Sequence, residues 1–143
     1  YLSELIEKIT GYYREELALI KTDFIVGKYK NCLLSGDLNR SVEVLQNMME
    51  NAIKYGDGRR VELIFPEDDE CVQIAVTNSG CTLGEDDLPH IFESFWRGAN
   101  AKNIRGSGLG LYICRQLMRK MNGEIFAEID GDIITVIAVF ARA

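Results

Sequence analysis

Apolar residues recur at helical spacing in three segments of the chain. In residues 1–20 the recurring residues that fall near one helical face are Leu2, Leu5, Ile6, Ile9 and Tyr13. Residues 38–55 carry a second stripe, and Asp37 is placed to cap that helix at its start. A third helix is expected over residues 109–121, ended by Asn122-Gly123.

Other segments are apolar or alternate in the manner of strands. Strands are expected at residues 24–29, 60–65, 71–77, 124–129 and 132–140, with a further short piece at 32–34. Short turns join the second strand to the third and the fourth to the fifth, which predicts two hairpins. A polar, glycine-bearing segment over residues 78–106 separates the hairpins and contains one short helix at 85–96.

This order of elements lacks the regular strand–helix alternation of a doubly wound fold. It predicts an α+β fold of two layers, in which about three helices cover one face of a mixed sheet. The length of 143 residues suits a single domain over residues 1–143.

The net charge of −6 argues against a nucleic-acid binder, which would present a basic face. The longest apolar run, residues 133–141, is far shorter than the about 20 residues of a membrane helix, and we expect no membrane contact by this fragment. The four cysteines form no C-x-x-C pair, which favours free thiols over a zinc site.

Three glycines alternate in RGSGLGLYI, residues 105–113, and lead directly into the third expected helix. Glycine loops at a helix start present backbone N–H groups to phosphates. No lysine follows as in a P-loop, and no strand precedes as in a dinucleotide fingerprint. A plain turn that lets the helix start close to the sheet remains the alternative.

The helix expected over residues 38–55 has two contrasting sides. Its apolar side is predicted to hold Leu38, Val42, Leu45, Met49, Ala52 and Ile53. Asn47, Glu50, Asn51 and Lys54 fall together opposite. That side is either a solvated face or a site, because amide and carboxylate oxygens suit Mg²⁺ and a lysine suits phosphate.

Two further stretches carry polar groups suited to a ligand. Asn78 and Gly80 follow an apolar strand, where an amide can meet the edge of a flat heterocycle. Arg97, Lys102 and Arg105 gather positive charge within an acidic chain.

In this order, the four stretches resemble the ATP-binding catalytic domain of bacterial sensor histidine kinases, within the gyrase–Hsp90–histidine kinase–MutL ATPase superfamily. NMMENAIKY (47–55) resembles the N box, NSGCT (78–82) the G1 box, IFESFWR (91–97) the F box and GSGLGL (106–111) the G2 box. The resemblance implies a Bergerat-type sandwich, ATP and Mg²⁺ as ligands, and an ATP lid over residues 80–106.

The resemblance also implies roles for individual residues. Nucleotide contacts fall to residues of the matching boxes and the lid: Asn47, Asn51, Lys54, Tyr55, Asn78, Gly80, Arg105, Gly106, Gly108, Leu109 and Gly110. Asn47 and Asn51 would also hold Mg²⁺. Catalysis is assigned to Asn51 and Arg97, with Glu50 a candidate general base by its position beside Asn51.

Two positions depart from the family pattern. Asn78 stands in place of the aspartate that accepts the adenine amino hydrogen, and Thr82 in place of the second glycine of the G1 box. A neutral hydrogen bond is about half as strong as a charge-assisted one. We therefore expect weaker nucleotide binding.

The phosphoacceptor is expected on another domain, because the motif around His90, LPHIF, does not resemble the acceptor motif. The implied partners are the histidine-containing dimerisation domain of the same full-length kinase and a downstream response regulator. Residues 1–20 resemble the lead-in after that domain, and we expect a cytoplasmic domain of a kinase anchored in the bacterial inner membrane. The alternatives are a degenerate nucleotide-sensing or interaction module without catalysis and a stand-alone serine kinase of the anti-sigma-factor type.

Overall fold

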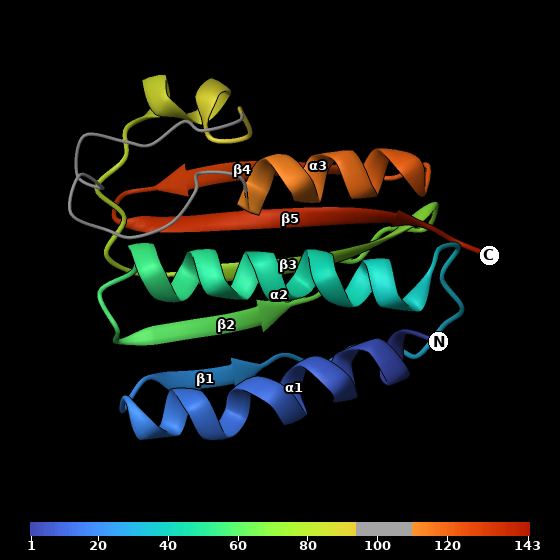
Figure 1. Ribbon diagram of the computed structural model, residues 1–143, viewed down its shortest axis with the longest axis horizontal. Coiled ribbons are helices and arrows are strands. Elements are labelled where there is room, and N and C mark those ends of the chain that lie inside the picture. The colour runs from blue at the N-terminus through green and yellow to red at the C-terminus, as the bar shows by residue number, and fades with distance from the viewer. Residues whose placement is uncertain (94–109) are drawn as a thin grey trace.

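A computed structural model describes residues 1–93 and 110–143. Its helices and strands are, in chain order, α1 (Leu2–Leu19), β1 (Asp23–Val26), α2 (Leu38–Tyr55), β2 (Arg60–Ile64), β3 (Cys71–Asn78), the 3-10 helix η1 (Glu85–His90), α3 (Gly110–Lys120), β4 (Glu124–Asp130) and β5 (Ile133–Ala141). The strands form one five-stranded sheet in the order β1-β2-β3-β5-β4 (Figure 1). Strands β1 and β2 are parallel and the other neighbours antiparallel, so the predicted mixed sheet and both hairpins are confirmed.

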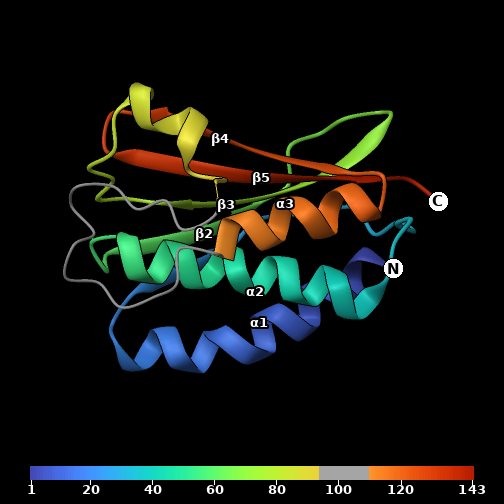
Figure 2. The same cartoon turned by 45° about the horizontal axis from the view of Figure 1, so that its top comes forward.

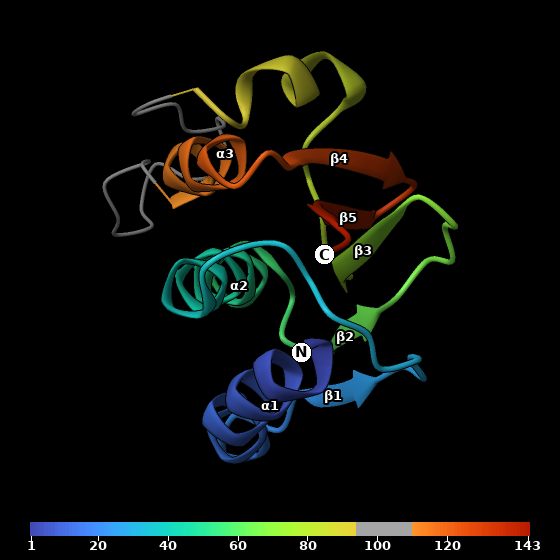
Figure 3. The ribbon, with the colours of Figure 1, turned by 90° about the vertical axis from the view of Figure 1, so that its right-hand side faces the viewer.

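The three α-helices lie together on one face of this sheet, as Figures 2 and 3 show. Helix α2 lies between α1 and α3 and runs along the middle of the helical layer. On β3 and β5, residues such as Ile74, Val76 and Phe140 are buried in the core that helices and sheet share. The predicted two-layer architecture is therefore confirmed.

Helix α2 begins and ends where the sequence predicts. The Asp37 side chain caps it, since Oδ1 accepts a hydrogen bond from the Arg40 N–H at 3.0 Å. Its fully buried residues differ in part from the predicted apolar side. Val44 and Met48 are buried although that side omitted them, whereas Leu38, Val42 and Ile53 are only half-buried. The reason is tertiary: α2 is flanked by a helix on each side, so one apolar stripe is not enough.

Helix α1 packs against α2 and β1. The residues predicted near one face are all buried, and Leu17 extends that face toward the helix end. None of the helices in the described parts of the chain combines the length and hydropathy that a membrane span requires.

Three expected elements differ from the structure. The strand expected over residues 24–29 ends at Val26, so residues 27–29 lie outside β1. Residues 32–34 form no strand, and only an isolated bridge pairs Leu34 with Arg142. The helix expected over residues 85–96 is the shorter η1 in its described part, and Pro89 within it lacks the N–H that a longer α-helix would use. Residues 94–96 lie outside the described residues.

Candidate functional site

The polar face of α2 contains the residues predicted to bind a ligand. Asn47, Glu50 and Asn51 are half-buried, whereas Lys54 is exposed to solvent. Asn47 and Asn51 are one helical turn apart and therefore neighbours on the helix surface. Glu50 connects this face to the neighbouring helix α1.

Glu50 is turned toward α1. The buried Tyr13 hydroxyl donates a hydrogen bond to Glu50 Oε1 at 2.8 Å and lies 3.4 Å from the Gln46 carbonyl oxygen. Burial, and then the hydrogen bond to this carboxylate, raise the pKa of Tyr13 far above its usual value. The hydroxyl thus stays a donor at all ordinary pH values, and the contact supports a role for Glu50 in joining α1 to α2.

On its other side, α2 contacts α3 through Cys114. Cys114 of α3 is fully buried, and its Sγ donates a hydrogen bond to the Val44 carbonyl oxygen at 3.4 Å. Burial raises the pKa of the Cys114 thiol to about 12, so the sulfur is protonated at neutral pH. The nearby Asn47 side chain lowers the pKa of this thiol, but less than burial raises it.

Asn78 lies at the end of β3, against the C-terminal end of α2. It is 5% exposed, and its Nδ2 donates to the Ser79 carbonyl oxygen at 3.0 Å. A Cβ added at Gly56 would lie 2.8 Å from Nδ2 and 2.6 Å from the Ala52 carbonyl oxygen. The missing side chain at Gly56 therefore allows Asn78 to approach the end of the helix.

The turn after α2 and the turn after β3 are joined by several contacts. The Asp57 N–H donates to the Ser79 carbonyl oxygen at 3.2 Å, and the Ser79 hydroxyl donates to Asp57 Oδ1 at 2.7 Å. The Ser79 hydroxyl and then the Arg59 N–H hold the pKa of Asp57 below its usual value. Residues 56–58 and 78–80 thus form one continuous wall, which we call the turn wall.

At Gly80, both the backbone conformation and the space beside Asp57 require glycine. Its φ is +83°, a conformation that side chains disfavour. A Cβ there would lie 2.5 Å from the Asp57 Cβ. Sequence reasoning singled out Gly80 but missed Asp57, because a Gly-Asp-Gly turn gives no sign of the segment that it contacts.

The segment after the turn wall is attached at both ends of its described part. The Cys81 N–H donates to the Asp132 carbonyl oxygen at 2.7 Å, beside the turn between β4 and β5. Farther along, the Arg115 guanidinium of α3 lies 4.2 Å from the centre of the buried Phe92 ring.

The remaining predicted residues of this segment lie outside the described residues: Arg97, Arg105, Gly106, Gly108 and Leu109. Gly110 is described and begins α3.

The donor groups of the described residues limit which metal ion could bind here. Among the described residues, no group of three or more histidine, cysteine, aspartate or glutamate side chains is placed to hold a metal ion. Asn47 and Asn51 of α2 offer neutral amide oxygens only. This set fits Mg²⁺, which keeps several waters and takes phosphate oxygens from a substrate, better than it fits a metal held by protein ligands alone.

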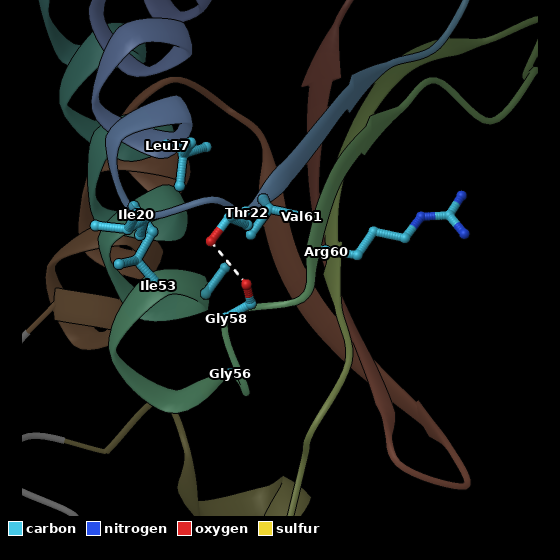
Figure 4. A pocket seen from close by; sticks show the side chains of 9 residues that line it. Leu17, Ile20, Thr22, Ile53, Gly56, Gly58, Arg60 and Val61 are labelled. Carbon is cyan, nitrogen blue, oxygen red and sulfur yellow. Dashed lines mark hydrogen bonds between the residues drawn. The ribbon is translucent and has the colours of Figure 1, made fainter.

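A small pocket lies between the C-terminal ends of α1 and α2 and the start of β2 (Figure 4). Its walls include Leu17, Ile53 and Val61, and Thr22 donates a hydrogen bond to the Gly58 carbonyl oxygen at 2.8 Å. The Arg60 side chain points away from it. Of the residues predicted from the sequence to bind a ligand, none lines this pocket.

Residues 36–140 match the family described as histidine kinase-, DNA gyrase B-, and HSP90-like ATPase. Hybrid signal transduction histidine kinase F of Dictyostelium discoideum is 37% identical over 102 residues, which cover 66% of this chain. Signal transduction histidine-protein kinase BaeS of Escherichia coli (strain K12) is 30% identical over 129 residues, or 88% of this chain. The chain spans only 9% and 28% of these two relatives.

Solved structures extend the likeness to almost every residue. The nucleotide-free catalytic domain of histidine kinase ThkA has a TM-score of 0.84 and 26% identity, covering 99% of this chain and 94% of that chain. ThkA in complex with response regulator protein TrrA gives a TM-score of 0.82 at 24% identity, covering 100% of this chain and 41% of that chain. The protein therefore belongs to the family of histidine kinase-, DNA gyrase B- and HSP90-like ATPases, and the structures that it resembles are catalytic domains of histidine kinases.

Proposed function

We propose that this domain binds ATP together with Mg²⁺ and transfers the γ-phosphoryl group to a histidine on a separate dimerisation domain. The observation that carries the proposal is the placement of Asn47, Asn51 and Lys54 on one face of α2, whose end meets the turn wall at Gly56 and Asn78. The family match over residues 36–140 supports ATP as the nucleotide.

The two ends of this arrangement suit the two ends of the nucleotide. Asn78, nearly buried behind Gly56, is suited to the adenine edge. Its Nδ2 is engaged with the Ser79 carbonyl oxygen, which leaves the amide oxygen as the acceptor for an amino hydrogen. Tyr55, the last residue of α2, and Gly80 of the turn wall are proposed to contact the adenosine.

The phosphate end is proposed to lie along α2. Asn47 and Asn51 would supply amide oxygens to Mg²⁺, and the exposed Lys54 would contribute a positive charge to a phosphate. When bound, Mg²⁺ neutralises the developing charge of phosphoryl transfer, a reaction that depends chiefly on positioning and electrostatics. Arg97, Arg105, Gly106, Gly108, Leu109 and Gly110 are proposed to complete this end.

The glutamate beside Asn51 has a different proposed role from the one its position suggests. A general base must reach the proton that it abstracts. The hydrogen bond from Tyr13 draws the Glu50 carboxylate toward α1 and supports a clamp between the two helices. Glu50→Gln, which preserves an acceptor for Tyr13, separates the two roles.

The partners are proposed from the family. They are the histidine-bearing dimerisation domain of the same kinase and a response regulator, by analogy with ThkA, whose complex with TrrA is solved. We also propose a cytoplasmic location for this domain, within a kinase anchored in the bacterial cell membrane.

The direct test is transfer of label from γ-labelled ATP to the dimerisation domain. We expect wild type and Asn39→Ala to transfer the label, because Asn39 is an exposed asparagine at the other end of α2. Asn51→Ala should fail to do so. If wild type binds nucleotide but never transfers label to any histidine, the domain is a nucleotide-sensing module, the alternative that the neutral Asn78 motivates.

A further inference from the structure

We infer that Asp57 is a positioning residue that, acting through Ser79, holds the Asn78 amide with its oxygen toward the base. The site then favours a purine with an amino group at position 6 over a purine with a carbonyl there. The inference rests on the proposed function, in which Asn78 meets the adenine edge. It goes beyond that function because it assigns base selectivity to two residues of the turn wall for which no contact with nucleotide is proposed.

The orientation of the Asn78 amide follows from its partner. Nδ2 donates to the Ser79 carbonyl oxygen at 3.0 Å, and none of the residues that the structure describes donates a hydrogen bond to Oδ1. If the amide were turned over, Oδ1 would face the Ser79 carbonyl oxygen, one acceptor against another. The carbonyl therefore keeps the nitrogen on its own side and leaves the amide oxygen for a ligand.

The Ser79 carbonyl is itself held by the other turn of the wall. The Asp57 N–H donates to it at 3.2 Å, so this oxygen accepts two hydrogen bonds and its capacity is filled. The Ser79 hydroxyl donates to Asp57 Oδ1 at 2.7 Å, and the same Oδ1 accepts the Arg59 N–H at 3.0 Å. Asp57 thus holds Ser79 through both its backbone and its side chain, and these contacts fix the carbonyl that orients Asn78.

The space around the amide is confined. Asn78 is 5% exposed, and a Cβ added at Gly56 would lie 2.8 Å from its Nδ2. A buried polar group that faces the wrong partner is costly. The adenine amino group donates to an oxygen, whereas the carbonyl of hypoxanthine would meet that oxygen as a second acceptor.

An asparagine depends on such support more than an aspartate does. A carboxylate presents oxygen on both of its branches, so either orientation accepts an amino hydrogen. An amide presents oxygen on one branch and N–H groups on the other. With Asn78 in this position, selectivity therefore depends on which branch the turn wall holds.

The test compares the affinities for two nucleotides. Calorimetric titration with non-hydrolysable analogues of ATP and of inosine triphosphate, both with Mg²⁺, gives the ratio of the two dissociation constants for each variant. Wild type should bind the ATP analogue about 10- to 100-fold more tightly, because the inosine carbonyl leaves the buried amide oxygen without a donor. Asp57→Ala and Ser79→Ala each break the 2.7 Å hydrogen bond and should each reduce the ratio by about two- to tenfold.

The direction of each change separates positioning from packing. An amide that is free to rotate can present its N–H groups to the inosine carbonyl. Both variants should therefore bind the ATP analogue more weakly and the inosine analogue more tightly than wild type does, whereas a general loss of structure would weaken both. The double variant should match either single variant, because the two changes remove the same hydrogen bond.

Two further variants serve as controls. Asp57→Asn keeps an oxygen for the Ser79 hydroxyl and should restore the ratio toward the wild-type value. Asp68→Ala removes a carboxylate that accepts two backbone N–H groups in the turn before β3, whereas Asn78 is the last residue of that strand, so the ratio should not change. In nucleotide-free protein, the NMR signals of the Asn78 side-chain amide should shift in Asp57→Ala and not in Asp68→Ala.

The outcomes distinguish the inference from the proposed function. The positioning role is wrong if wild type binds both analogues equally, if Asp57→Ala and Ser79→Ala weaken both by the same factor, or if Asp68→Ala lowers the ratio as much. If folded wild type binds neither nucleotide, the proposed function is wrong and the inference fails with it. Binding of both analogues with an unchanged ratio in Asp57→Ala contradicts the inference alone.

Discussion

Replacing Gly80 with alanine tests the geometry of the turn wall. At a φ of +83° an alanine adopts a left-handed conformation, which costs about 1–2 kcal/mol. The new Cβ would also lie 2.5 Å from the Asp57 Cβ and 2.7 Å from its backbone nitrogen, so the backbone of one turn must move. Overpacking of this kind costs about 1–3 kcal/mol, and the two effects together predict a loss of about 2–5 kcal/mol in the free energy of unfolding.

Gly58 offers a matched control in the same wall. Its φ of +75° is similar, but a Cβ there would meet nothing within 4 Å. Gly58→Ala should therefore lose only the conformational part, about 1–2 kcal/mol. Urea unfolding followed by circular dichroism compares both variants with wild type. Equal losses in the two variants would refute the argument from steric overlap with Asp57.

Three further predictions concern side-chain contacts. Tyr13→Phe removes the donor to Glu50 and should lower the free energy of unfolding by about 1–2 kcal/mol in a urea titration. Glu50→Gln should retain phosphoryl transfer, and a stable but inactive Glu50→Gln would contradict the role of Glu50 as a clamp between α1 and α2. In native protein at about pH 8, Cys114 should not react with iodoacetamide until urea unfolds the chain, because burial raises the pKa of its thiol to about 12. Rapid labelling of Cys114 in the native protein would contradict its burial. The folded chain holds the pKa of Asp57 below its unfolded value, so the stability that the ionised carboxylate adds is present at neutral pH and disappears as the pH falls below about 4. The unfolding free energies of wild type and Asp57→Ala should accordingly converge in acid, and a gap that stays constant with pH would show that ionisation contributes nothing.

Much of the fold was predictable because local signals and burial agree. Helix α2 has a capping aspartate at one end and a Gly-Asp-Gly turn at the other, and its bounds matched the prediction. The two hairpins followed from short turns between apolar runs. The prediction of a strand at residues 32–34 was wrong, because a few apolar residues do not reveal whether a neighbouring strand is there to pair with them.

The motifs of the site could be predicted from the sequence, whereas the side-chain contacts between helices could not. Asn47, Glu50 and Asn51 share one face in a helical projection, yet Glu50 turns toward Tyr13 of α1. Tyr13 is distant in sequence from Glu50, and its place in the helical pattern is that of an ordinary core residue. Nothing in a helical period reveals which flank of α2 each neighbouring helix will occupy, since that depends on tertiary packing.

The central claim, that α2 and the turn wall bind a nucleotide with Mg²⁺, is tested most directly by calorimetry. A non-hydrolysable ATP analogue is titrated into wild type, Asn51→Ala and Asn39→Ala, each with and without Mg²⁺. The account predicts binding that Mg²⁺ strengthens in wild type and Asn39→Ala and that Asn51→Ala loses. Binding by folded Asn51→Ala as tight as that of wild type, or no binding by folded wild type, would contradict it.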